Sequence, residues 1–398
     1  MERLNKEEQN LVTIQGLYLF AGSLVSIFIT TFLFKYGGIK ASLIFWGIHY
    51  ANLFLWYLLS GFTLRKVSAA FLIRLSLFSS GIFFLLLFLL KEKSLNFIVP
   101  LAIVSGFSSG NFWPAYNLNQ YALPRKEKRL NFFGIQNAFT NILGALAPFI
   151  GGAIIATGGK FLNLFPDSGY IILFFVVYLI YIISAIYVGK LPKNKIPDFN
   201  FKQFFNNKRT ERWKMVLGLW TLRGLYDITL SVVGGILIFL IVKKELILGL
   251  TQTLSAILGA VVSILAIRLL HKTFRYFWVG AIGLAFGVAI FALLQNFTGL
   301  LFFIILTSCS APLLENWRFI VYHHALDEND GEKEDKYFLQ IEREGVLDIC
   351  RALSCLCVYF LVQTGNEIQF ARFWLYVLLV FPIMSGFLLD MYGDLKKN

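Results

Sequence analysis

Charged side chains that interrupt long apolar stretches are the residues of this chain best placed to do chemistry. A charge at the centre of a bilayer costs roughly 2.5 to 3.5 kcal/mol, so it persists there only when it is paired or wetted. The charges recur three or four residues apart, which places neighbours on one helical face. If these stretches cross a membrane, we expect the charges to face the protein interior. They are Arg74, Arg223, Asp227, Glu315, Arg318, Glu344, Asp348 and Arg351.

The pair Arg223 and Asp227 lies near the middle of its apolar stretch, at the depth where transporter sites form. We interpret Asp227 as a proton carrier and Arg223 as its partner. The remaining charges of the second half lie nearer the ends of their stretches. A salt-bridge latch that closes the cytoplasmic side is the favoured role for them, and direct proton or substrate binding is the alternative. This gate network comprises Glu315, Arg318, Glu344, Asp348 and Arg351.

The first half carries amides and aromatic rings in place of charges. Helical spacing gathers several of them on single faces, where they could hydrogen-bond and stack a small polar or amphiphilic ligand. For any single amide, tying two helices together is the favoured role. The candidate substrate-binding residues, including one tryptophan beside Arg223, are Trp113, Tyr116, Asn117, Gln120, Gln136, Asn137, Asn141, His49 and Trp220.

These residues belong to apolar segments of about twenty residues, each long enough to cross about 30 Å of hydrocarbon as a helix. The composition is 57% hydrophobic and only 15% charged, and runs such as GIFFLLLFLL lack the alternation of a membrane β-strand. We therefore predict an all-α membrane protein with twelve transmembrane helices. The segments are 12–34, 41–62, 69–90, 97–121, 132–156, 169–188, 214–242, 248–270, 276–293, 299–321, 341–362 and 373–390.

The distribution of positive charge predicts the orientation. A net charge of +13 would suggest nucleic acid in a soluble protein. Here two thirds of the 36 Lys and Arg residues lie in every second polar break. The positive-inside rule then places both termini in the cytoplasm. We expect the protein to lie in the plasma membrane. The longest basic break, 190–213, separates an N-terminal bundle, 1–189, from a C-terminal bundle, 214–398.

Local motifs resemble those of the major facilitator superfamily (MFS). Pro148, Gly151 and Gly152 match the Pro-x-x-Gly-Gly end of the family's fifth helix, and Gly106 and Gly110 are similar to its glycine-spaced fourth helix. The resemblance covers the whole chain and implies two pseudo-symmetric six-helix bundles that alternate access to a central site. Two features depart from the family pattern: the loop GFTLRKVS lacks the usual acidic residue, and the fourth-helix arginine is replaced by Ala102.

The sequence offers no sign of an enzyme. It contains no phosphate-binding loop or catalytic triad, and its four cysteines and four histidines do not converge on a metal site. We therefore expect neither cofactor nor metal. The predicted function is proton-coupled secondary transport of a small polar or amphiphilic solute by a monomer that contacts membrane lipids and no nucleic acid. The alternatives are a flippase for lipids or lipid-linked sugars and a transporter-like receptor that moves nothing.

Overall fold

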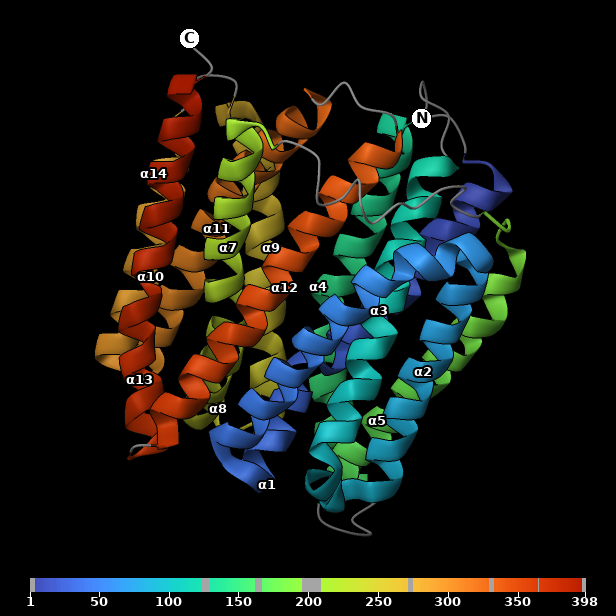
Figure 1. Cartoon of the computed structure of the whole chain (residues 1–398). Helices are drawn as coiled ribbons and strands as arrows, with labels where there is room; N and C mark the ends of the chain where they lie inside the picture. The colour runs from blue at the N-terminus through green and yellow to red at the C-terminus, as the bar shows by residue number, and fades with distance from the viewer. Residues whose placement is uncertain are drawn as a thin grey trace. The chain divides into compact units, whose positions relative to one another are not determined.

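Helices make up the regular structure of the described residues, and no strand occurs among them. The computed structural model describes residues 4–123, 129–161, 167–194, 209–270, 275–328, 333–363 and 365–395. The helices up to residue 190 are α1 (Lys6–Lys66), α2 (Ala69–Leu90), η1 (Lys91–Phe97), α3 (Ile98–Ala122), α4 (Arg129–Phe161), α5 (Ser168–Tyr187) and η3 (Val188–Lys190) (Figure 1). Those that follow are α7 (Glu211–Thr229), η4 (Leu230–Gly234), α8 (Gly235–Val242), α9 (Glu245–Leu270), α10 (Tyr276–Leu294), α11 (Phe297–Asp327), α12 (Lys333–Gln363), α13 (Glu367–Leu378) and α14 (Val380–Leu395).

Ten helices within the described ranges are long and apolar enough to cross a membrane. Two of them, Lys6–Lys66 with 61 residues and Ala69–Gln120 with 52, are far longer than one crossing requires. The first reverses at Gly38, whose φ of 68° is readily adopted only by glycine. The second contains the 3₁₀ turn η1 between α2 and α3. Twelve crossings therefore require each of these two stretches to cross twice, and that number stays a prediction.

Polar caps mark where several helices begin. Asn5 and Glu8 form a reciprocal capping box at the start of α1. Ser68, Thr210 and Asn296 accept hydrogen bonds from the first turns of α2, α7 and α11. These short side chains satisfy amide groups that the helices leave free, so the sequence fixes these starts locally.

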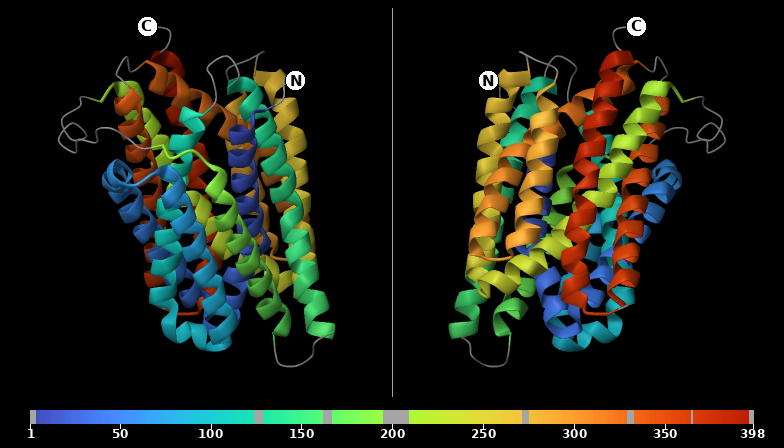
Figure 2. Two further views of the ribbon diagram at one scale, coloured as in Figure 1. Left: turned by 90° about the vertical axis from the view of Figure 1, so that its right-hand side faces the viewer. Right: turned by 90° about the vertical axis from the view of Figure 1, so that its left-hand side faces the viewer.

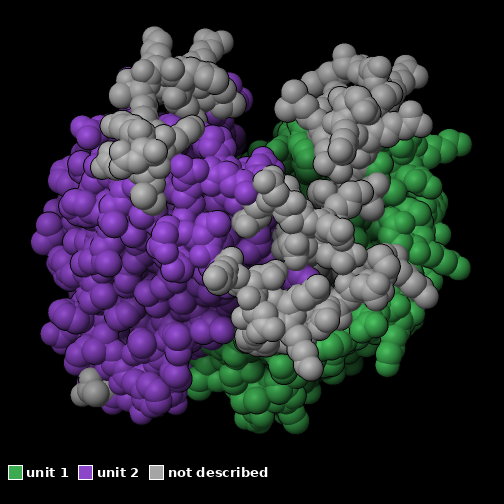
Figure 3. Space-filling model, turned by 45° about the horizontal axis from the view of Figure 1, so that its top comes forward, with its two compact units in different colours: residues 1–37, 44–199, 244–253 green, residues 38–43, 200–243, 254–398 purple. Residues whose placement is uncertain are grey.

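The chain divides into two compact units (Figure 3). Unit 1 comprises residues 1–37, 44–199 and 244–253, and unit 2 comprises 38–43, 200–243 and 254–398. The predicted linker 190–213 falls largely outside the described residues, because 195–208 are not described. The division into bundles 1–189 and 214–398 rests on membrane topology and stays a prediction.

Close helix contact holds unit 1 together. A Cβ atom on Gly106 would lie 2.5 Å from the His49 carbonyl oxygen, and one on Gly110 would lie 2.6 Å from the Leu53 carbonyl oxygen. Only glycine permits such an approach of α3 to the second arm of α1. The two glycines that resemble the family's fourth helix thus have a direct packing reason.

In unit 2, α7 packs along α12, and α10 packs along α11 (Figure 2). Buried rings at one end of these helices form its core, including Trp213, Trp220, Trp317 and Tyr322. Trp220 is only 1% exposed, so it is a packing residue here and does not line an open surface. The membrane-length segment Glu211–Val242 contains a π-helical turn, η4, directly after Thr229. Such turns interrupt regular helix geometry and are frequent at functional sites.

Candidate functional site

Three helices of unit 2 place their charges at mid-length. Asp227 lies at the middle of Glu211–Val242, and Asp348 is the central residue of the 31-residue helix α12. Glu315 lies one turn beyond the midpoint of α11, which also has 31 residues. The depth of the α11 and α12 charges in the membrane, which the sequence places near the inner ends of the apolar stretches, stays a prediction. The polar sequences after residue 321 and before residue 341 continue these helices, because hydropathy locates membrane boundaries rather than helix ends.

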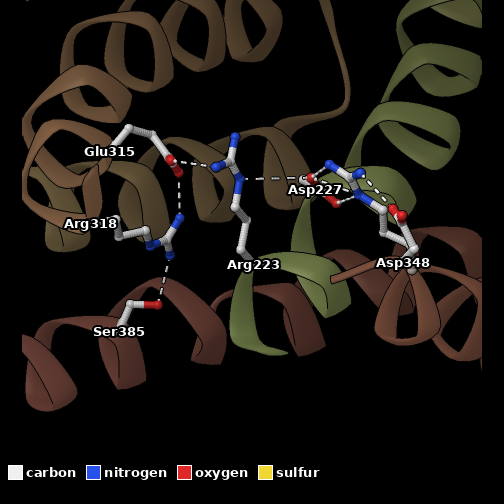
Figure 4. Close-up of polar contacts among 7 residues, drawn as sticks. Arg223, Asp227, Glu315, Arg318, Asp348 and Ser385 are labelled. Carbon is white, nitrogen blue, oxygen red and sulfur yellow. Dashed lines mark hydrogen bonds and ion pairs between the residues drawn. The ribbon is translucent and has the colours of Figure 1, made fainter. Parts of the chain in front are cut away.

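A chain of ion pairs crosses these helices (Figure 4). Arg318 pairs with Glu315 and donates a hydrogen bond of 2.7 Å from Nη2 to Ser385 Oγ on α14. Arg223 Nη1 lies 3.3 Å from Glu315 Oε2, and Arg223 Nε lies 4.0 Å from Asp227 Oδ2. Arg223 thus bridges the acid of α11 and the acid of its own helix.

Arg351 closes the other end of this chain. Its Nε lies 3.1 Å from both carboxylate oxygens of Asp227, and its Nη2 donates to Asp227 Oδ2 at 2.5 Å. Its Nη1 also donates to Asp348 Oδ1 at 3.1 Å. The close partner of Asp227 is therefore Arg351, whereas Arg223, which the sequence paired with it, makes only the 4.0 Å contact.

Two charges lie apart from the chain. Glu344 pairs with its neighbour Arg343, whose guanidinium carbon lies 4.3 Å from the Tyr322 ring centroid and 5.5 Å from that of Trp220. Arg74 is exposed near the start of α2, so the expectation that it faces the interior was wrong. Long basic side chains near a helix end can extend toward water, which removes the cost of burial.

Exposure divides the chain into a buried and an open part. The side chains of Arg318 and Asp348 are 3% and 2% exposed. Those of Arg223, Asp227 and Glu315 are 25%, 28% and 28% exposed. Since lipid contact would be costly for these three charges, we infer that their open sides face water or a ligand. The series of ion pairs contains three acids and three arginines, so the formal charge of these six residues is zero.

Several amides of unit 1 bond to another amide or to a tyrosine hydroxyl. Tyr116 Oη donates to Gln15 Oε1 at 2.7 Å, and Gln120 Nε2 donates to Gln136 Oε1 at 3.2 Å. Asn117 Nδ2 donates to Tyr57 Oη at 3.2 Å. These pairs join α1 to α3 and α3 to α4, so they satisfy buried polar groups and tie the helices of unit 1.

The other unit 1 candidates separate into two groups. His49 is buried against Ser105, with Nδ1 and Oγ 3.0 Å apart, and Trp113 meets the Tyr18 ring edge-on at 5.7 Å. Asn137 and Asn141 are exposed, one turn apart on α4. These two asparagines are the unit 1 candidates most open to a ligand.

The sequence did not single out Ser385, Tyr57 or Arg343. Ser385 lies alone in the apolar run FPIMSGFLL, and a single hydroxyl there gives no signal until Arg318 is placed beside it. Arg343 was assigned to the polar break before residue 344, although it could have been found by continuing the helical face. Among the described residues, no group of His, Cys, Asp and Glu could hold a metal ion.

Comparisons with known proteins address the fold. No family model matches the chain. The uncharacterised Bacillus subtilis protein YqgE is 21% identical over 369 residues, which cover 92% of this chain and 84% of YqgE. An uncharacterised Geobacillus stearothermophilus protein is 23% identical over 177 residues, 44% of this chain and 80% of its own length.

Solved transporters superpose over nearly the whole chain. The nucleoside transporter NupG gives a TM-score of 0.71 at 10% identity, covering 98% of this chain and 99% of NupG. A bacterial homologue of the iron transporter ferroportin, facing inward, gives 0.72 at 13% identity over 98% and 99%. A bacterial homologue of the lysosomal transporter Spinster gives 0.71 at 13% identity over 97% and 96%. This chain has the major facilitator fold. The predicted all-helical transporter fold and the multi-pass membrane class are thus confirmed. Twelve crossings and two pseudo-symmetric six-helix bundles stay predictions.

Proposed function

We propose that this MFS-fold protein is a proton-coupled secondary transporter that moves a small polar or amphiphilic solute by alternating access. The observation that carries the proposal is the chain of six charges from Arg318 to Asp348 at the middle of membrane-length helices. Apolar side chains would stabilise the fold at least as well, because buried ion pairs often add little net stability. A purely structural role therefore does not explain these charges.

The charge count indicates where a proton would bind. Arg351 is shared by two carboxylates, Asp227 and Asp348, so this triad carries a formal charge of −1. One added proton makes it neutral. Asp227 is the more exposed of the two acids, which supports it as the group that exchanges protons with water. Movement of Arg351 or Arg223 between access states would change its proton affinity.

The structural neighbours support transport but not one substrate. They include a nucleoside transporter, a bacterial homologue of an iron transporter, a bacterial metal transporter and the human organic anion transporter MFSD10. One fold therefore carries chemically different cargo, and the substrate depends on the side chains of each site.

Reconstituted vesicles test the coupling. A thermal-shift panel of nucleosides, sugars, amino acids and carboxylates would select a solute, whose uptake is then followed under an imposed proton gradient. We expect Asp227→Asn to abolish gradient-driven accumulation while counterflow exchange persists, because the amide keeps the shape and cannot titrate. Glu211→Gln, at an exposed acid paired with Lys214, is the matched control.

Full accumulation by Asp227→Asn would show that this acid is structural. Transfer of labelled phospholipid between leaflets, without solute uptake, would favour a flippase instead. The proposal includes a plasma-membrane location with both termini in the cytoplasm. Labelling of cysteines placed in 190–213 from the outside of intact cells would contradict that orientation.

A further inference from the structure

The three arginines of the ion chain are held to very different degrees. Arg318 is nearly buried between Glu315 and Ser385, and Arg351 donates to two carboxylates. Arg223 has ion contacts of 3.3 Å and 4.0 Å and is a quarter exposed. A guanidinium has five N–H donors in a fixed fork, so the two ion contacts of Arg223 leave donors that water or a ligand can take.

The surrounding charges make Arg223 the surplus cation. Glu315 and Arg318 neutralise each other, and the Asp227–Arg351–Asp348 triad carries −1. Arg223 supplies the balancing charge, but it is 4.0 Å from the triad. When the triad gains a proton, Arg223 is left with a positive charge that the chain no longer compensates.

A second polar group, three residues from Arg223 on α7, lacks a hydrogen-bond partner in the described part of the chain. The Tyr226 hydroxyl is buried without a hydrogen-bond partner among the described residues, and it lies within electrostatic range of Glu315, Arg318 and Asp227. A buried hydroxyl normally has a hydrogen-bond partner, because an unsatisfied buried polar group costs free energy. Tyr226 and Arg223 together therefore leave donors that the protein itself does not fill.

We propose that Arg223 binds an anionic group of the transported solute, a carboxylate or a phosphate, and that the proton and the anion enhance each other's binding. This inference rests on the proposed transport function and names its substrate class. Protonation of the triad removes the negative charge that lies 4.0 Å from Arg223, and an anion bound to Arg223 restores the charge balance. By linkage the two effects are equal, so anion affinity rises as pH falls.

Other titratable or charged groups that face this site could contribute to such a pH dependence. On α7 the group is Tyr226, and on α11 the groups are Glu315 and Arg318. On α12 they are Arg343, near Asp348, and Cys355, near Asp227 and Arg351. A pH dependence of anion binding that is lost in Asp227→Asn would identify the triad as its source.

Ligands that share a phenyl ring and differ in the charge of their head group test the anion. Benzoate and phenylphosphonate are compared with benzamide and benzyltrimethylammonium by thermal shift on the purified full-length protein at pH 5.5 and 7.5. We expect the anions alone to stabilise the wild type, and more strongly at pH 5.5. Preference for phenylphosphonate over benzoate would assign the group as phosphate, and the reverse as carboxylate.

Variants separate the site from a general charge effect. Arg223→Gln should weaken anion binding at least about tenfold, with Arg223→Lys intermediate, because a charge-assisted fork is lost. Asp227→Asn should bind the anion tightly at both pH values, since it mimics the protonated triad. Arg74→Gln, at an exposed arginine, should bind as the wild type does.

Several results would overturn the inference. They are the absence of anion stabilisation at pH 5.5, stabilisation only by the neutral or cationic ligand, and unchanged anion binding in Arg223→Gln. If Arg223→Gln unfolds, Arg223→Lys and Tyr226→Phe provide the test, and wild-type affinity in both would also reject it. Gradient-driven uptake of a neutral solute that persists in Arg223→Gln would leave the transport proposal intact while rejecting this one.

Discussion

Units 1 and 2 solve the problem of polar groups in apolar helices in different ways. Unit 1 pairs neutral groups, such as Gln120 with Gln136 and Tyr116 with Gln15. Unit 2 joins six charges in series, and four of them remain partly exposed. Neutral pairs respond little to pH or voltage, whereas the ion chain changes when a single proton is added. From this comparison we expect the bonded polar pairs of unit 1 to serve mainly packing, and the ion chain of unit 2 to respond to protons.

The strongest test of this contrast removes the shared cation. Arg351→Gln leaves Asp227 and Asp348 without their common partner, so we expect a loss of about 3 to 5 kcal/mol in the free energy of unfolding. Thermal or denaturant unfolding in detergent measures it. The double variant Asp348→Asn with Arg351→Gln should recover part of the loss. A loss of stability no larger than that of Arg74→Gln would mean that these ion pairs are hydrated and contribute little to folding.

A backbone contact in unit 1 should give the next largest effect. Gly106→Ala places a methyl group 2.5 Å from the His49 carbonyl oxygen, and we expect roughly 1 to 3 kcal/mol of destabilisation from overpacking. Gly134→Ala is the matched control, because nothing lies within 4 Å of its Cβ position. Equal stabilities of the two variants would show that α3 and α1 can separate without cost.

A smaller effect is expected when an amide pair in unit 1 is broken. Gln120→Ala removes the partner of the buried Gln136, and hydrogen bonds between membrane helices contribute about 0.6 kcal/mol on average. The unfolding temperature should fall slightly, while solute affinity per folded molecule stays constant. A large drop in affinity at unchanged stability would instead make Gln120 a ligand contact.

The smallest stability effect is expected at the exposed asparagine of α4. Asn141→Ala should change the free energy of unfolding by less than about 0.5 kcal/mol, because its side chain is exposed. Its transport rate should nevertheless fall if this face contacts the solute. Unchanged transport in both Asn141→Ala and Asn137→Ala would confine the solute contacts to other residues.

Much of the site could be recognised from residue type alone. Six residues stand out because a charge within an apolar helix costs free energy unless it is paired or hydrated. They are Arg223, Asp227, Glu315, Arg318, Asp348 and Arg351. Their pairing could not be predicted in the same way. The sequence joined Arg223 to Asp227 by helical spacing, but spacing within α7 says nothing about Arg351 on α12, which reaches Asp227 more closely.

The unit 1 candidates show the same limit. Asn117, Gln120, Asn137 and Asn141 have similar chemistry and lie on faces of neighbouring helices, so composition treats them alike. Tertiary packing gives the first two partners and leaves the last two exposed. Trp220 shares a helical face with Arg223 but enters the aromatic core of unit 2.

The sequence by itself determined that this chain is a helical membrane protein, because the length and apolar character of each segment match the bilayer and every backbone polar group there must bond within a helix. It also determined which residues carry charge into that apolar setting. Only the tertiary structure decided which charge meets which, since contacts between α7, α11 and α12 depend on packing over a long sequence separation. The unequal holding of Arg223, Arg318 and Arg351 is a property of that packing.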